Sequence, residues 1–179
     1  MAIYQSHYFS PVYDDVKGHL YTAKLRGNSD PVFTELPGAT YNFAWVFSVG
    51  NEIFVQIQLP HAYKEGTDLR PHLHLLTNDT NWASRTGKFQ LDYVIIPVNE
   101  TTGAEQTINT IVYTPTAQNK QEIVSCGTIT GTTLQISDLL FFRVSRIATT
   151  GTELTNLYIL DFDCHIQKDS DGSLSLYTK

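Results

Sequence analysis

The sequence predicts an all-β protein, an antiparallel β-sandwich of about eight strands with a jelly-roll-like arrangement. Composition is the first observation behind this prediction, because the 179 residues include 22 Thr, 10 Tyr and 9 Phe but only 9 Ala and 1 Met. Threonine and aromatic residues favour strands, whereas alanine and methionine favour helices. Spacing is the second observation, because short runs of alternating apolar and polar residues recur about every 8–14 residues, separated by turn residues.

We divide the chain into two parts. Residues 1–36 show the least alternation, and we expect an extended N-terminal arm that either lies on a partner subunit or adds a strand to the sheet edge. Residues 37–179 carry the sandwich, and a chain of this length buries a full core without disulfide or metal. We therefore expect Cys126 and Cys164 to be two buried thiols rather than a bridge.

The clearest pattern surrounds a turn at residues 49–52. Apolar residues alternate over residues 41–47 before the turn and over residues 53–59 after it. Two alternating runs around a Gly-Asn turn are typical of a β-hairpin. We predict that this hairpin ends at Pro60, because proline has no amide hydrogen for the ladder.

Six further strands are predicted from similar but weaker alternation. They span residues 69–76, 88–95, 107–114, 121–130, 139–147 and 157–167. In the last strand, one apolar face is expected to hold Tyr158, Leu160, Phe162, Cys164 and Ile166. The other face then holds Asp161, Asp163 and His165.

Arg143 lies on the polar side of the strand predicted for residues 139–147. It forms a buried ion pair with Asp92 or Asp161, or else all three residues line a face exposed to solvent or to a partner. We favour the second interpretation, because antiparallel sheets often have one polar face.

Charge and motif content argue against several classes of function. The chain has 12 Lys and Arg against 18 Asp and Glu, and a net charge of −6 disfavours direct binding to nucleic acid or to an anionic membrane. No apolar run approaches the roughly 20 residues of a membrane-spanning helix, and the first residues lack the pattern of a secretory signal. No nucleophile motif surrounds either cysteine and no glycine-rich phosphate loop occurs, so we predict a protein that is not an enzyme and has no cofactor.

A metal site is the alternative that the histidines raise. His72 and His74 share one face of a predicted strand, roughly 6–7 Å apart, and two imidazoles so placed can share a metal ion. His165 and Asp163 share a face of another strand and can supply further ligands. A cupin-like enzyme, however, needs a glutamate shortly after the paired histidines, and Asp79 is the only acid nearby. We therefore expect no metal and keep a cupin-like metal-dependent enzyme as the alternative.

A carbohydrate-binding β-sandwich is a second alternative. Ten tyrosines and two tryptophans are enough to build a surface on which sugar rings stack. In a sandwich, however, aromatic side chains more often fill the core and the subunit interface.

One segment carries a more specific pattern, a loop followed by a strand with two histidines. The pattern consists of Pro60, Tyr63, Lys64, Glu65, Gly66, Thr67 and Asp68, then Pro71, His72 and His74, and later Phe89, Leu91 and Tyr93. It resembles a pattern found in virion structural proteins of phages and other prokaryotic viruses. The resemblance covers residues 57–96, and Leu75 stands where an aromatic residue often follows the second histidine.

The resemblance implies a non-enzymatic virion structural protein of a tailed phage. The role it implies is head decoration, a head fibre, or attachment at the neck or tail. It also implies a homotrimer that contacts other virion proteins and is found in the virion after synthesis in the host cytoplasm. The motif residues 63–68, Pro71, His72 and His74 would then serve the fold or its interfaces, and no catalytic residue is implied.

Overall fold

The computed structural model describes residues 11–172, which form ten strands and two single-turn 3-10 helices. The strands are β1 (Val12–Lys17), β2 (Val32–Glu35), β3 (Phe43–Phe47), β4 (Glu52–Gln58), β5 (Arg70–Thr77), β6 (Gly87–Ile96), β7 (Gln106–Tyr113), β8 (Glu122–Ser125), β9 (Leu139–Ile147) and β10 (Leu157–Lys168). The helices are η1 (Leu20–Thr22) and η2 (Trp82–Ser84). Within this part of the chain, neither helix has the length and apolar character needed to cross a membrane.

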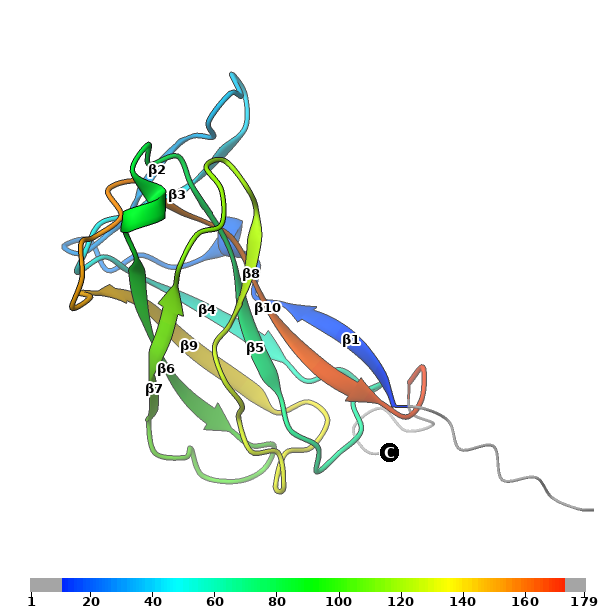
Figure 1. Ribbon diagram of the computed structural model, residues 1–179. Coiled ribbons are helices and arrows are strands. Elements are labelled where there is room, and N and C mark those ends of the chain that lie inside the picture. The colour runs from blue at the N-terminus through cyan, green and yellow to red at the C-terminus, as the bar shows by residue number, and fades with distance from the viewer. Residues whose placement is uncertain (1–10, 173–179) are drawn as a thin grey trace, which may run out of the picture.

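Two antiparallel sheets form a sandwich (Figure 1). Sheet A has the strand order β2-β3-β10-β5-β8, with β1 also paired to β10, and sheet B has the order β4-β9-β6-β7. From β3 to β10 the chain crosses between the sheets at every connection except the one from β6 to β7. These eight strands, wound into two four-stranded sheets, form a jelly roll. The predicted fold class is therefore confirmed, and the eight predicted strands are β3 to β10.

The core lies between the inner faces of the two sheets. Phe47 and Leu73 contribute from sheet A, and Ile53, Phe89 and Phe142 contribute from sheet B. Each is at most 2% exposed, because alternate side chains of a strand point to the same face. The outer faces carry the polar side chains of the candidate site.

The predicted hairpin at residues 41–59 is wrong. β3 and β4 follow one another through a tight turn, but β3 pairs with β2 and β10, while β4 pairs with β9. The turn instead carries the chain from one sheet to the other. Its amides bond to distant segments, since the Gly50 N–H donates to the Arg146 carbonyl and the Glu52 N–H donates to the Ser29 carbonyl.

The single apolar face predicted for residues 157–167 is also wrong. A β-bulge shifts the register of β10 between Ile159 and Asp161. Before the bulge Ile159 points into the core, and after it Phe162 does. Tyr158 therefore lies on the outer face, in a small second apolar cluster with Leu160.

The strand predicted at residues 121–130 is shorter than expected, since β8 ends at Ser125. Gly127 has a φ of +97°, a left-handed conformation that turns the chain out of the ladder. Ile129 then makes only an isolated bridge to Leu69.

Two strands come from the segment before residue 37. β1 pairs with the C-terminal half of β10, from Val12 opposite Lys168 to Lys17 opposite Asp163. β2 pairs with β3 at the other end of sheet A. Figure 1 shows β1 and β10 running side by side. The residues expected in the arm before position 11 lie outside the described part of the chain.

Candidate functional site

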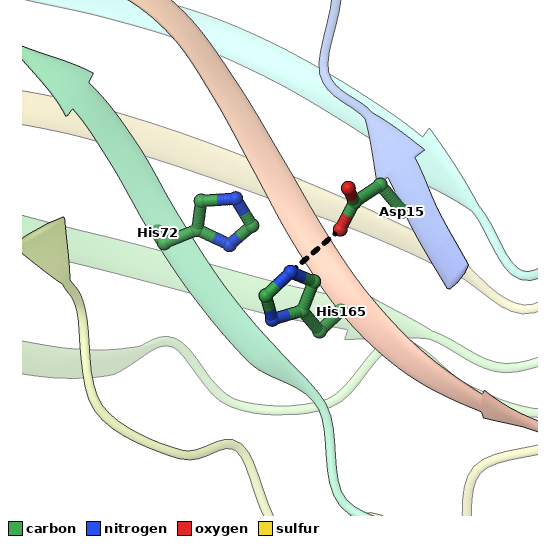
Figure 2. A group of neighbouring side chains, drawn as sticks. All are labelled: Asp15, His72 and His165. Carbon is green, nitrogen blue, oxygen red and sulfur yellow. Dashed lines mark ion pairs between the residues drawn. The ribbon is translucent and has the colours of Figure 1, made fainter. Parts of the chain in front are cut away.

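Three histidines and two aspartates gather on the outer face of sheet A, and we term them the histidine cluster. Asp15 comes from β1, His72 and His74 come from β5, and Asp163 and His165 come from β10. Antiparallel pairing places His72 opposite Asp163, and Asp15 opposite His165. Figure 2 shows the rings of His72 and His165 side by side, with the Asp15 carboxylate directed at His165.

Distances within the histidine cluster are short. Nε2 of His74 lies 3.0 Å from Oδ2 of Asp163, and Nε2 of His72 lies 3.8 Å from the same oxygen. Nε2 of His165 lies 2.9 Å from Oδ1 of Asp15. The ring centroid of His72 is 5.2 Å from that of His74 and 4.3 Å from that of His165. Imidazole nitrogens and carboxylate oxygens therefore converge here, and both are ligands for divalent transition metals.

Burial divides the histidine cluster into an inner and an outer part. The side chains of His72, His74 and Asp163 are 5%, 16% and 2% exposed, whereas those of Asp15 and His165 are 44% and 45% exposed. Burial lowers the pKa of His72, against an opposing effect of its contact with the backbone of Arg70. The His72 ring is therefore neutral at pH 7.

The sequence predicts that His72 and His74 point to the same side of one strand, and that Asp163 and His165 do so on another. The structure brings all four residues onto one sheet face. Asp15 was missed. β1 exposes residues of both faces, so its sequence shows no apolar alternation that would have placed this carboxylate on a strand.

Hydrogen bonds between its own residues stabilise the loop of the virion-like motif. Tyr63 is fully buried, and its hydroxyl donates to the Thr67 carbonyl. The Thr67 hydroxyl donates to the Lys64 carbonyl at 2.6 Å. Gly66 has a φ of +76°, which a glycine adopts without steric cost. The Lys64 N–H donates to the Gln167 carbonyl at 2.7 Å, which fixes the loop to β10.

The same loop is anchored to the segment between β8 and β9. Oε1 of Glu65 accepts from the Ile136 N–H at 3.0 Å, and Oδ1 of Asp68 accepts from the Gly131 N–H at 3.1 Å. Pro71 is the second residue of β5 and is buried. Residues 63–68 therefore have a structural role within the chain, whereas His72 and His74 lie in the histidine cluster.

On the outer face of sheet B, Arg143 and Asp92 form an ion pair. Nη2 of Arg143 lies 2.6 Å and Nε lies 2.8 Å from Oδ2 of Asp92, which is 3% exposed. Burial alone would raise the pKa of Asp92, but hydrogen bonds from Thr107, Gln90 and Arg143 outweigh it and lower the pKa. Arg143 and Asp92 lie on an outer sheet face, as expected, but they also form an ion pair with a buried carboxylate, because the register of β6 and β9 places the two directly opposite each other.

A cleft of about 670 Å³ lies beside this ion pair. Its walls are the segment 18–26 and parts of β4, β6 and β9. Lys24, Arg26 and Glu105 also line it, so its charge is mixed in sign.

The structure locates an exposed group of aromatic rings, a surface that the sequence raised only as an alternative and did not place, and we term this group the aromatic platform. It consists of Tyr21 from η1, Phe33 from β2, and Phe43 and Trp45 from β3. The Phe33 ring lies 6.0, 5.6 and 4.8 Å from those of Tyr21, Phe43 and Trp45. Tyr21, Phe33 and Phe43 are 75%, 44% and 37% exposed. Phe43 and Trp45 alternate in step with the core residue Phe47, so their spacing predicts burial. In the structure, however, Phe43 is 37% exposed and Trp45 is only half-buried.

Cys126 and Cys164 are free thiols and are buried. Burial raises the pKa of both to about 12, so neither forms a thiolate at neutral pH. This environment suits core packing and not nucleophilic chemistry.

Comparisons with known proteins assign no family. No protein-family model and no curated protein matches the chain. One similar structure is the CBM22-2 xylan-binding domain from Paenibacillus barcinonensis Xyn10C, with 10% identity over 86% of this chain and 98% of that one and a TM-score of 0.46. Another holds the CBM22-1 and GH10 modules of Clostridium thermocellum endo-1,4-β-D-xylanase 10B with xylohexaose, with 8% identity over 91% of this chain and 27% of that one and a TM-score of 0.37.

A third similar structure is the stem and receptor binding domain of the spike protein P1 from bacteriophage PM2. It has 11% identity over 65% of this chain and 56% of that one, with a TM-score of 0.29. At these identities and TM-scores, the three likenesses give this chain neither a family nor a function.

Proposed function

We propose that this protein is a non-enzymatic virion structural protein of a tailed phage. It acts in head decoration, in a head fibre or in attachment at the neck or tail, through contacts with copies of itself and with other virion proteins. It forms a homotrimer and is found in the virion after synthesis in the host cytoplasm. It uses no cofactor for this contact role and does not bind nucleic acid or a membrane directly.

The aromatic platform is the observation that carries this proposal. Its rings lie beside β2, which is an edge strand of sheet A and pairs, within residues 11–172, with β3 alone. Val32 on the same strand is 63% exposed. Open edges and clustered exposed rings are liabilities for a monomer and typical features of an interface. A second copy of the chain covers them in the proposed oligomer.

The loop of residues 60–68, which we term the motif loop, supports the same role. The side chains of Tyr63, Thr67, Glu65 and Asp68 all bond within the chain. These bonds hold the loop in place, so the pattern that resembles virion proteins encodes a rigid loop. A rigid loop is what a particle component needs to present a fixed surface.

Light scattering coupled to size exclusion tests the proposal on the full chain. We expect a species of about 60 kDa, three times the 20.1 kDa chain. The double substitution Tyr21→Ser and Phe33→Ser should shift it to the monomer mass. Tyr41→Ser is the matched control, because Tyr41 is 88% exposed and makes none of the ring contacts of the aromatic platform. A wild-type protein that stays at 20 kDa at micromolar concentration would contradict the proposal.

Carbohydrate binding is a second candidate function, favoured by the same exposed rings. Aromatic faces of this kind stack on sugar rings, and the Phe33 ring lies against three neighbours that hold it in place. A glycan array would separate the two functions. A glycan signal lost in Phe33→Ala but kept in Tyr41→Ala would favour sugar binding. An array without signal would count against sugar binding and leave the contact role as the proposed function.

A further inference from the structure

We propose that the histidine cluster binds a divalent transition-metal ion, with Zn²⁺ the best match, through Nε2 of His72, Nε2 of His74 and Oδ2 of Asp163. Ligand atoms of these three residues lie within 4.8 Å of one another. The site goes beyond the contact role proposed above and does not depend on it. It uses three of the four residues that the sequence raised as alternative metal ligands, and it leaves out His165.

The spacing of the three atoms fits one small ion. Zinc holds its nitrogen and oxygen ligands at about 2.0–2.2 Å in a tetrahedral site, so neighbouring ligand atoms stand about 3.4 Å apart. The Asp163 oxygen lies 3.0 Å from the His74 nitrogen and 3.8 Å from the His72 nitrogen. Both observed separations lie within about 0.4 Å of the required one, so an ion of this size fits between the carboxylate and each ring.

Hydrogen bonding within the chain does not account for this arrangement. Nε2 of His74 is buried and makes no hydrogen bond among the described residues, although the Asp163 carboxylate is close to it. Oδ1 of Asp163 lies 3.5 Å from the Lys17 ammonium, whereas Oδ2 is the oxygen that faces the two rings. Buried polar atoms are nearly always satisfied, so the unbonded Nε2 of His74 points to a missing partner. A cation between this nitrogen and Oδ2 of Asp163 supplies that partner.

The far nitrogens of both rings have contacts that orient the near ones. Nδ1 of His72 lies 3.4 Å from the Arg70 carbonyl oxygen. A proton on Nδ1 directed at that carbonyl leaves the lone pair on Nε2, which is how metal-bound histidines are usually held. Nδ1 of His74 lies 2.7 Å from Nε2 of the Gln121 side-chain amide, which makes Nδ1 the acceptor in this orientation. Metal binding through Nε2 of His74 requires a half-turn of the amide, so that its oxygen accepts from the Nδ1–H group.

The charge around the histidine cluster favours a cation. Asp15, Asp161 and Asp163 bring three carboxylates to this face of the sheet. Among residues 11–172, Lys17 is the one lysine or arginine within 4 Å of these carboxylates, at 2.9 Å from Asp161 and 3.5 Å from Asp163. One ammonium leaves an excess of negative charge.

The bound ion joins β5 to β10, the paired strands at the centre of sheet A. His165 packs against the His72 ring and is held by Asp15, so it forms one wall of the site. His74 is 16% exposed, and its side of the site is where a water molecule takes the fourth tetrahedral position. The ion thus acts as a staple on the outer face of the sheet.

Metal titration of the full chain tests this inference. The protein is stripped with a chelator, and Zn²⁺ is then added in a calorimeter, with metal content measured after gel filtration. We expect one Zn²⁺ per chain and a rise in the thermal unfolding midpoint of roughly 5–10 °C at zinc a hundredfold above Kd. Co²⁺ in place of Zn²⁺ should give the intense visible absorption of a tetrahedral site.

Two variants and a control decide the ligand set. Asp163→Asn and His74→Gln should each weaken zinc affinity at least tenfold and abolish the tetrahedral cobalt spectrum. His19→Asn is the matched control, because His19 is exposed, lies outside the histidine cluster and has a left-handed backbone that asparagine tolerates. Circular dichroism checks folding, and His74→Gln serves if the buried Asp163→Asn variant does not fold. No stoichiometric zinc in the wild type, or equal zinc binding in wild type and His74→Gln, would overturn the proposal.

Discussion

Replacing Gly131 by alanine is expected to detach residues 60–68, the motif loop, from the segment between β8 and β9. A Cβ added at Gly131 would lie 1.7 Å from the Thr67 carbonyl oxygen, 2.3 Å from its carbon and 3.0 Å from the Asp68 nitrogen. Ordinary van der Waals contact needs about 3.5 Å. All three obstacles are backbone atoms, so no side-chain rotation relieves the clash. The two segments must move apart by about 1.5–2 Å.

The size of the effect follows from the hydrogen bonds that such a shift breaks. Three bonds of 3.0–3.1 Å join the two segments, and their donors are the amides of Gly66, Gly131 and Ile136. A shift of that size takes each beyond the range of a hydrogen bond. Two of the acceptors are carboxylates, for which a bond contributes about 1.5–3 kcal/mol, and the third contributes about 1 kcal/mol. With partial solvation of the freed groups, we expect a loss of about 3–5 kcal/mol.

Urea unfolding followed by tryptophan fluorescence measures this loss. The matched control is Gly151→Ala, because a Cβ there would meet only the Thr86 hydroxyl at an ordinary 3.7 Å. We expect the control to stay within about 1 kcal/mol of the wild type. If Gly131→Ala proved as stable as Gly151→Ala, the close packing that gives the motif loop its rigid structure would be disproved.

Three other predictions concern buried polar and sulfur groups. Burial alone would raise the pKa of Asp79, but hydrogen bonds from neighbouring groups and the charge of Arg85 outweigh it and lower the pKa to about 2. This pKa lies below the ordinary 3.8, so the ionised Asp79 stabilises the fold above pH 4, and this stabilisation is lost as the pH falls toward 2. Urea unfolding across that pH range should show a loss of about 2 kcal/mol in the wild type. The variant Asp79→Asn should lack this loss. The side chain of Arg146 is 1% exposed and donates to two main-chain carbonyls. Arg146→Met should therefore lower the unfolding free energy by about 3–5 kcal/mol. A loss under 1 kcal/mol would show that water takes over the hydrogen bonds of the guanidinium. Burial raises the pKa of the Cys126 and Cys164 thiols to about 12, so a thiol reagent should label neither in native protein and both in guanidinium, and rapid native labelling would contradict their burial.

The eight jelly-roll strands were predictable because each turns one apolar face to the core. Ile53, Val55 and Ile57 are at most 5% exposed, while Gln56 between them is exposed. Burial on one side of a sheet produces this alternation directly in the sequence. For β1 the sequence left open whether the segment is an arm or an added strand, because Val12 and Tyr13 are 56% and 54% exposed and neither face of the strand is buried.

The pairing of the strands was not predictable in this way. A tight glycine turn follows β3 whether the chain returns along the same sheet or crosses to the other one. The difference lies in the partners of the turn, and Gly50 bonds to Arg146, which is 96 positions later in the sequence. The residues of a turn carry no information about a contact so distant in the sequence, so the hairpin was predicted in error.

The histidine cluster shows both limits at once. Period-two spacing places His72 with His74 and Asp163 with His165, but their meeting depends on the register of β5 and β10, which lie far apart in the sequence. The burial of a side chain cannot be predicted from this spacing either. The Asp163 side chain is only 2% exposed although it lies on an outer sheet face, and this burial is the reason to consider it as a ligand. A buried ion pair yields little net stability, because the cost of desolvation offsets the attraction. Imidazoles grouped around a buried carboxylate are therefore better accounted for as ligands, since a divalent ion compensates the desolvation that the ion pairs alone do not.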